Sequence, residues 1–314
     1  MKKFFVFLPL IIIFLLACTN NNSSKSQEKA VLSSSSVGKD TLDMFKFLYE
    51  VQATSLPILL HTEDSMMSYG IEMLHTFKYP KLQKEFDAVF KNVENYKKII
   101  REGLLYAKGI EFDFIAQTHL DAMRGEHSED SHKSQWAIFY LLEFNKYEAV
   151  GVEDATSEEV SLKTMEKEMI QGEKELHGVD YKGQLLLDTM KPENFAMGDV
   201  RYWLSHKDKV HLFGLQDRPM ATLNLKSEYL DDFPDADKMQ SYLMMLRSYL
   251  AFAKASIAAH KHGYKKIAII MGLWHTNDFF IMAKRFGVHM QFYDCSGDRK
   301  TFNDHIKHAK SIVG

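Results

Sequence analysis

The chain has 314 residues, of which 46% are hydrophobic and 26% are charged, and its formal net charge is -3. This composition is sufficient for a full hydrophobic core, and no basic cluster is present that would follow a phosphate backbone, so nucleic acid is not an expected partner. With two cysteines, Cys18 and Cys295, the chain has neither a disulfide framework nor a cysteine-rich metal site.

Residues 1–17 have the pattern of a signal peptide. Two lysines follow the first methionine, and the apolar run at 4–17 is shorter than the roughly 20 residues of a membrane span. Its end, Leu-Leu-Ala before Cys18, resembles the lipobox of bacterial lipoproteins, in which the cysteine is acylated. The sequence therefore predicts anchoring to membrane lipid through Cys18, in the cell envelope, at the outer membrane or cell surface.

Two further segments precede the region in which strands are expected. Residues 18–40 are polar and rich in Asn and Ser, which predicts a flexible tether. Residues 41–108 carry apolar side chains at spacings of three and four, which predicts an all-helical lead-in. The clearest run in this lead-in is Leu82, Phe86, Val89, Val93, Tyr96 and Ile100.

From residue 109 to 314, short β-rich runs alternate with amphipathic helices. Strands are expected at 112–116, 147–152, 210–213, 267–271 and 288–293. This alternation predicts an α/β domain, in which a parallel sheet of about four or five strands is covered by helices and the strand 267–271 is central and buried.

Two helices of this domain are predicted in more detail. One covers residues 131–143, and a longer one covers 238–262 and ends before Gly263. The apolar face expected for the longer helix consists of Tyr242, Met245, Tyr249, Ala253, Ile257 and His260.

Polar side chains follow several of the predicted strands. In an open parallel sheet, residues just beyond the carboxyl ends of the strands converge on the crevice where ligands bind. The residues in these positions are His119, Glu153, Asp217 and His275. His275 ends the sequence Gly-Leu-Trp-His after a buried strand, and residues 276–278, Thr-Asn-Asp, are expected to cap the next helix.

A Gly-x-x-His motif ends at His275 and is followed by a helix, by Arg-Phe-Gly-Val at 285–288 and by another strand. This order resembles the C-terminal motif of the TraB/Tiki-like superfamily. Relatives of that superfamily include erythromycin esterase-like and ChaN-like proteins. The resemblance covers about residues 109–294 and implies an early histidine motif and a second strand that ends in a glutamate, here Glu153. The early histidine is either His119, directly at a strand end, or His127 within Gly-Glu-His-Ser.

The resemblance implies a hydrolase-type site for an ester or a peptide substrate, with His127, Glu153 and His275 as its catalytic residues. Imidazoles and a carboxylate on converging strand ends can hold a divalent metal and leave one coordination position open for water. The expected ligands are His119 or His127, Glu153, Asp217 and His275. Without a metal, the erythromycin esterase-like alternative uses His275 and Glu153 as a base and its orienting partner, acting through water.

Two other functions stay open at this point. The resemblance to ChaN-like lipoproteins implies binding of haem or another ligand, with the iron ligated by exposed His or Tyr and the haem itself bound noncovalently. A non-catalytic surface protein with a degenerate enzyme fold is favoured by Ala116, where a glycine is expected, and by Gln216, where a glutamate is expected. Histidines expected to be incidental surface or helix-end residues are His260, His262, His305 and His308.

Overall fold

The computed structural model describes residues 59–118, 129–153, 155–161, 163–165, 167, 197–206, 209–228 and 235–313. Cys18, His119 and His127 lie outside the described residues. The elements in chain order are α4 (Leu59–Thr76), η2 (Pro80–Leu82), α5 (Gln83–Phe90), α6 (Val93–Tyr106), β1 (Glu111–Gln117), α7 (Glu129–Asn145), β2 (Ala149–Val152), α9 (Gly198–His206), β3 (His211–Gly214), α10 (Arg218–Glu228), α11 (Ala236–His262), β4 (Lys266–Gly272), η5 (Leu273–His275), α12 (Thr276–Phe286), β5 (His289–Asp294) and α13 (Arg299–Val313).

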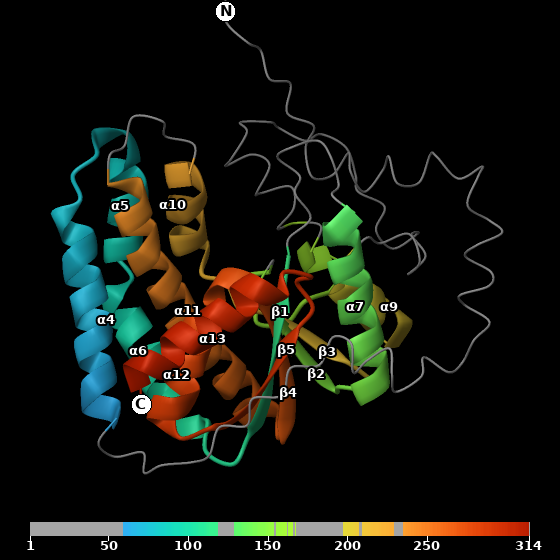
Figure 1. Cartoon of the computed structure of the whole chain (residues 1–314). Coiled ribbons are helices and arrows are strands. Elements are labelled where there is room, and N and C mark those ends of the chain that lie inside the picture. Colours follow the sequence, from blue (N-terminus) through green and yellow to red (C-terminus); the bar gives the residue numbers. More distant parts are fainter. Residues whose placement is uncertain are drawn as a thin grey trace, which may run out of the picture.

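The five strands form one parallel sheet in the order β3-β2-β4-β1-β5, with helices around it (Figure 1). The predicted α/β fold with a helix-covered parallel sheet is confirmed. Strand β4 is central, as predicted, because it pairs with β1 on one side and with β2 on the other. Since all strands run in the same direction, their carboxyl ends lie at one edge of the sheet.

The two faces of the sheet pack into two different cores. Along β4, Ile267, Ile269 and Met271 face the larger core, which contains residues of α6, α11 and α12. Ala268 and Ile270 face the smaller core, which contains residues of α7 and α9. Successive side chains of a strand point to opposite faces, so a strand covered on both faces is apolar at nearly every position.

The helices that precede β1 pack into the same core as the sheet. Phe86 of α5 and Tyr96 of α6 are buried together with residues of β1 and β4. At Gly103 helices α6 and α11 approach so closely that an added Cβ would lie 2.4 Å from the Cα of Ala253. Only a glycine permits this approach, because even the Cβ of an alanine would overlap the backbone of α11.

Helix α11 departs from the one-sided pattern expected for it. Tyr242 and Ile257 of the predicted apolar face are only partly buried, and His260 is exposed. The most completely buried apolar side chains in the first half of α11 are Met239, Leu243, Leu246 and Leu250. The physical reason is that α11 contacts α4 and α6 as well as β4 and α12, so a single face does not describe its burial. Its predicted end is confirmed, because Gly263 adopts a left-handed conformation with φ 76°.

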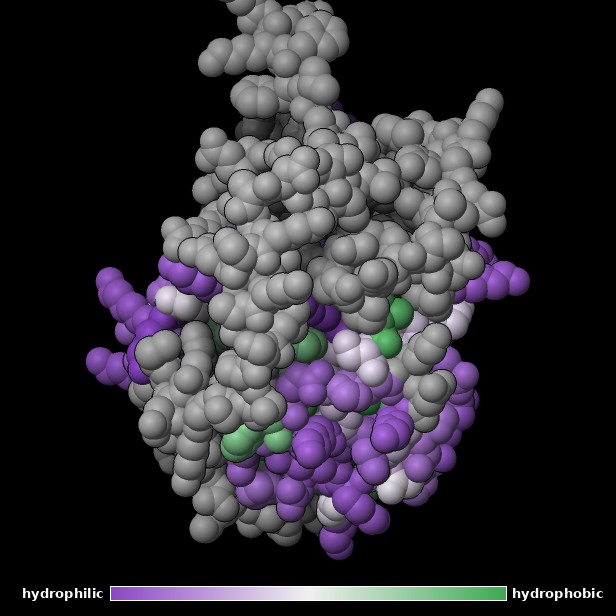
Figure 2. Space-filling view, turned by 90° about the vertical axis from the view of Figure 1, so that its right-hand side faces the viewer, coloured by the Kyte–Doolittle hydropathy of each residue, from purple (hydrophilic) through white to green (hydrophobic). Residues whose placement is uncertain are grey.

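The face of the molecule that carries α7 and α9 is largely polar where its residues are described (Figure 2). Figure 2 shows the side of the molecule on which α7 and α9 lie, where the coloured residues are mainly hydrophilic and the hydrophobic ones form small separate groups. Among the described helices, none has both the length and the apolar character needed to cross a membrane.

Candidate functional site

Glu153 and His275 meet at the carboxyl edge of the sheet. Glu153 directly follows β2, and His275 ends the short helix η5 that follows β4. Because β2 and β4 are neighbours in the sheet, the two side chains lie together, with His275 Nε2 3.3 Å from Glu153 Oε1. Both residues are buried, with exposed fractions of 5% and 1%. The structure thus brings together two of the residues that the sequence singled out.

The carboxylate of Glu153 accepts hydrogen bonds on both oxygens. Arg247 Nη2 and Gln216 Nε2 donate to Oε1 at 2.6 and 3.0 Å, and the backbone N–H of Gly272 donates to Oε2 at 2.6 Å. Arg247 Nε also donates to Gln216 Oε1 at 3.1 Å, which fixes the plane of the guanidinium. The negative charge of Glu153 is therefore balanced by a buried guanidinium, the arrangement that makes a buried carboxylate tolerable.

The second ring nitrogen of His275 contacts Ser248, which lies on α11. Ser248 Oγ lies 2.7 Å from His275 Nδ1, 2.9 Å from Asp278 Oδ2 and 2.8 Å from the carbonyl oxygen of Met244. A serine hydroxyl has one hydrogen, and the Met244 carbonyl can only accept it. The hydroxyl can therefore donate to only one of these partners at a time, and its contact with Asp278 is also a hydrogen bond when a protonated Asp278 donates to it.

Several neighbours shift the pKa of Asp278. Burial raises the pKa of Asp278 above its usual value, while the charge of His275 and the hydrogen bonds from Ser248 and Asn277 act in the opposite direction. Burial is the largest of these effects, because a carboxylate loses more hydration than a neutral carboxyl group. Asp278, Ser248, His275, Glu153 and Arg247 thus form one continuous polar chain beside the sheet.

The cap expected at residues 276–278 is not formed. Helix α12 already begins at Thr276, and no side chain caps its start. Thr276 Oγ1 donates to the carbonyl of Leu273 at 2.6 Å, and Asp278 faces Ser248. The expected cap is wrong because η5 leads directly into α12, so the first turn of α12 is preceded by helical backbone.

Asp217 is not brought into this network. Its Oδ1 accepts hydrogen bonds from Tyr96 Oη at 2.7 Å and from the backbone N–H of Met220 at 3.1 Å. These are the contacts of a residue that caps a helix, here α10, and ties it to α6. Gln216, one position earlier, reaches Glu153 instead. His119 and His127 lie outside the described residues.

Sequence reasoning missed four members of the network, which are Gln216, Arg247, Ser248 and Asp278. One signal could have identified Arg247, since a charged residue stands among apolar ones in a helix that packs on the sheet. Such a residue is expected to have a buried partner of opposite charge. Gln216 was singled out only as a departure from an expected glutamate, and no comparable signal marks Ser248, because serine is common on protein surfaces.

The pair of His275 and Glu153 does not fit a divalent metal between its members. Arg247 lies 2.6 Å from Glu153 Oε1, the oxygen that faces His275. A metal ion at this oxygen would stand beside a guanidinium of like charge and would have to displace it. The arrangement is instead suited to proton transfer, because an imidazole contacts a charge-balanced carboxylate at the ligand-binding edge of the sheet.

No family model, no curated protein and no solved structure matches the chain.

Proposed function

We propose that this protein is a lipid-anchored hydrolase of the cell envelope, in which His275 and Glu153 act as an acid–base pair on an ester or peptide substrate, without a metal between them. The observation that carries the proposal is the 3.3 Å contact between His275 Nε2 and Glu153 Oε1, from two neighbouring strand ends. Ionisable groups that are buried together at the edge where such sheets bind ligands are commonly catalytic.

In the proposed reaction, His275 Nδ1 takes a proton from a water molecule through the Ser248 hydroxyl that it contacts, as the water oxygen attacks the carbonyl carbon of the substrate. Meanwhile, His275 Nε2–H donates to Glu153 Oε1. The contact of this nitrogen with Glu153 is longer than the 2.6 Å contact of Arg247 with the same oxygen. The carboxylate stabilises the imidazolium that forms, and the imidazolium then returns the proton to the departing alcohol or amine. Ser248 orients the ring through Nδ1.

Arg247 is a positioning residue in this scheme. Its guanidinium balances the charge of Glu153 and holds the carboxylate through Nη2, while Nε holds the side chain of Gln216. A carboxylate fixed by three protein donors costs little reorganisation when the charge of the imidazole changes. Gln216, which departs from the glutamate expected by resemblance, thus has a hydrogen-bonding role beside Glu153.

The proposal also includes the location of the protein at a membrane and its kinship with a protein superfamily. The pattern before Cys18 supports a lipid anchor, and the Gly-x-x-His at His275 supports kinship with the TraB/Tiki-like superfamily, with the erythromycin esterase-like chemistry. A divalent metal held by His119 or His127, and the haem-binding alternative, stay predictions.

The test compares the wild type with His275→Gln and Glu153→Gln on a panel of ester and peptide substrates, with and without EDTA. His275→Gln keeps a hydrogen-bonding group in the network, whereas Glu153→Gln also leaves the buried guanidinium of Arg247 without its counter-charge and should lower stability, so thermal unfolding checks both variants. We expect kcat/KM to fall by roughly 10²- to 10⁴-fold in both variants, the usual contribution of an acid–base group. The exposed His308 supplies the control, His308→Ala, which should keep full turnover.

Three outcomes would overturn the proposal. Turnover that persists in both folded variants would mean that the pair is structural, and no turnover by the wild type would favour a non-catalytic fold. Loss of turnover with EDTA in protein that stays folded would replace the metal-free reaction by a metal-dependent one.

A further inference from the structure

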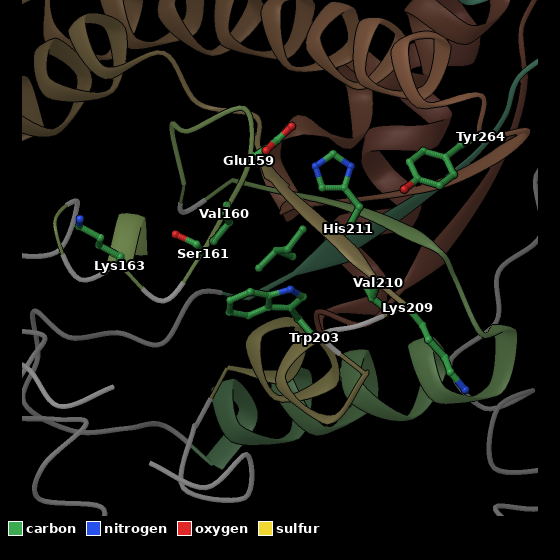
Figure 3. A pocket seen from close by; sticks show the side chains of 10 residues that line it. Glu159, Val160, Ser161, Lys163, Trp203, Lys209, Val210, His211 and Tyr264 are labelled. Carbon is green, nitrogen blue, oxygen red and sulfur yellow. The ribbon is translucent and has the colours of Figure 1, made fainter. Parts of the chain in front are cut away.

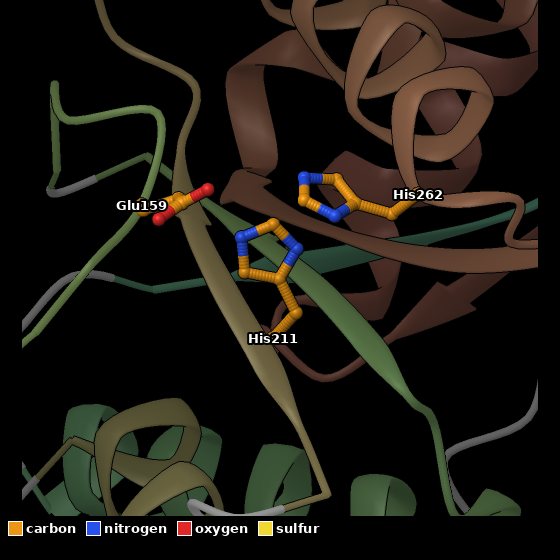
Figure 4. A group of neighbouring side chains, drawn as sticks. All are labelled: Glu159, His211 and His262. Carbon is orange, nitrogen blue, oxygen red and sulfur yellow. The ribbon is translucent and has the colours of Figure 1, made fainter.

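Three ligand-type side chains gather away from the pair of His275 and Glu153. They are Glu159 in the segment after β2, His211 at the start of β3 and His262 at the end of α11, and Figure 4 shows them around a common space. One ligand atom from each lies within 4.8 Å of the other two. Among the described residues this is the one group of such side chains with that geometry.

The backbone explains how Glu159 reaches the amino end of β3. Residues 157–160 run back along the edge of that strand, since the N–H of Gly214 donates to the carbonyl of Ser157 and the N–H of Val160 donates to the carbonyl of Leu212, at 2.7 and 2.9 Å. This pairing covers the outer edge of the sheet and brings Glu159 beside His211. His262 arrives on the same side because α11 ends just before β4 begins.

The geometry requires only a small contraction to bind a metal. In a tetrahedral zinc site with metal–ligand bonds of about 2.0–2.1 Å, the ligand atoms lie roughly 3.3 Å from one another. The ligand atoms of this cluster lie within 4.8 Å of one another. Each separation would therefore have to shorten by at most about 1.5 Å. Glu159 and His262 are exposed and can rotate, whereas His211 is held by its strand. Two mobile ligands can therefore close on one that is already fixed.

The surroundings of His211 lower the pKa of its ring. Both ring nitrogens of His211 are shielded from solvent, and neither has a partner that meets hydrogen-bond geometry. The nearby backbone of Glu158 raises the pKa of the ring. Burial is the largest effect and lowers this pKa, the charges of His262 and Lys261 lower it further, and Glu159 raises it. A neutral imidazole with an unused nitrogen is what divalent metals bind.

The cluster borders a solvent-accessible hollow of about 680 Å³ at the amino end of β3. Glu159 and His211 line this hollow together with Trp203 and Tyr264, while Lys163 and Lys209 lie at its periphery and point away from its centre (Figure 3). Metal ions can therefore reach the cluster from solvent. Three protein ligands also leave a tetrahedral ion one position for water or a small molecule in the hollow.

We propose that Glu159, His211 and His262 form a second site, which binds a divalent transition metal of the zinc class and keeps one coordination position open. Two imidazoles select such metals over Mg²⁺ and Ca²⁺, which prefer oxygen ligands. The bound ion joins the segment after β2, the start of β3 and the end of α11, so it also stabilises the fold. His262, expected to be an incidental helix-end residue, is a ligand in this proposal.

The experiment titrates Zn²⁺ into metal-free, untagged protein in competition with a chromophoric chelator, and follows the melting temperature in parallel. The variants are Glu159→Gln, His211→Ala and His262→Ala. We expect one ion per wild-type chain, a rise in melting temperature with Zn²⁺, and an affinity at least roughly tenfold lower in each variant.

Two neighbours of the ligands give matched controls. Glu158→Gln replaces an exposed carboxylate adjacent to Glu159, and His260→Ala replaces an exposed imidazole two positions before His262. Both should bind Zn²⁺ as the wild type does. Because Glu159 and His262 are exposed, their replacement leaves the core intact even if His211→Ala fails to fold.

The proposal is overturned if Zn²⁺ does not bind to the wild type, if the exposed-ligand variants bind it as tightly, or if the controls lose it equally. Substitution by Co²⁺ adds a second readout, since a tetrahedral site should give visible absorption that disappears in Glu159→Gln. No step of this test measures turnover, so its result is independent of the proposed hydrolase reaction.

Discussion

Ser248 shows how much a single buried hydroxyl decides about the candidate site. Its one hydrogen cannot satisfy His275, Asp278 and the Met244 carbonyl together. Burial raises the pKa of Asp278, and a protonated Asp278 can donate to Ser248 and leave the hydroxyl hydrogen for His275. A buried network of this kind is rigid when every group is satisfied and costly when one is not.

Replacement of Asp278 by Asn tests this protonation. The pKa of Asp278 in the folded protein is raised above its usual 3.8. As the pH rises past 3.8, Asp278 therefore loses its proton in the unfolded chain before it does so in the folded protein. The wild type loses stability over this pH range, until the pH passes the pKa of the folded state. The Asn side chain has no such titration and its amide still donates to Ser248. The free energy of unfolding of Asp278→Asn, relative to wild type, should therefore increase with pH from about pH 4 upward.

Urea unfolding at a series of pH values measures this difference. Asp304, which is exposed, supplies the control, and Asp304→Asn should show no comparable rise. A difference for Asp278→Asn that stays constant or falls as pH rises would contradict a protonated Asp278.

At the scale of elements, the packing of α6 on α11 places the polar residues of the site. Arg247 and Ser248 lie on α11, and the closest approach of the two helices is at Gly103 and Ala253, one to two turns farther along α11. Helix α11 also packs against β4 and η5. The distance between α11 and the strand ends therefore depends on contacts formed by a helix that precedes the sheet in the sequence.

Gly103→Ala should destabilise the protein by about 1–3 kcal/mol, because the added Cβ meets backbone atoms and neither helix can yield without repacking. The closest of these atoms lies 2.4 Å from the Cβ position. Leu105→Ala, on the same helix but with the side chain 61% exposed, is the control and should change stability by less than about 0.5 kcal/mol. If Gly103→Ala and Leu105→Ala changed the free energy of chemical unfolding equally, α6 and α11 would separate easily.

At the scale of the whole molecule, the sheet carries two clusters with different chemistry. His275 and Glu153 lie beyond the carboxyl ends of the central strands, whereas His211 and His262 lie at the amino end of β3 and just before β4. A protein held at a membrane surface through its first residues would present both clusters to the same compartment. The expected anchor, Cys18, lies outside the described residues.

Cys18→Ala should abolish incorporation of labelled palmitate and move the protein from the membrane fraction to the soluble fraction, because stable anchoring depends on acyl chains. Cys295→Ala is the matched control. Cys295 is buried, and burial raises the pKa of its thiol, so it is not accessible for acylation in the folded protein. Labelling that persists in Cys18→Ala would contradict the anchor.

The sequence alone determined the type and much of the extent of the five strands and of helices α7 and α11. The strand expected at 267–271 is β4 at Lys266–Gly272, and the helix expected at 238–262 is α11 at Ala236–His262. These predictions succeed because periodicity and terminal glycines reflect contacts between residues two to four positions apart. The parallel sheet followed from the same local patterns, since alternating strands and helices leave few other arrangements.

Only the tertiary structure decided which polar residues meet. Glu153 and His275 are 122 positions apart and Arg247 belongs to a third element, so no local pattern contains their distance. The strand order β3-β2-β4-β1-β5 makes β2 and β4 neighbours, and it depends on how the crossover helices pack. Asp217 and Gln216 differ by one position yet serve different partners, because the direction of a side chain at a strand end is set by the packing around it.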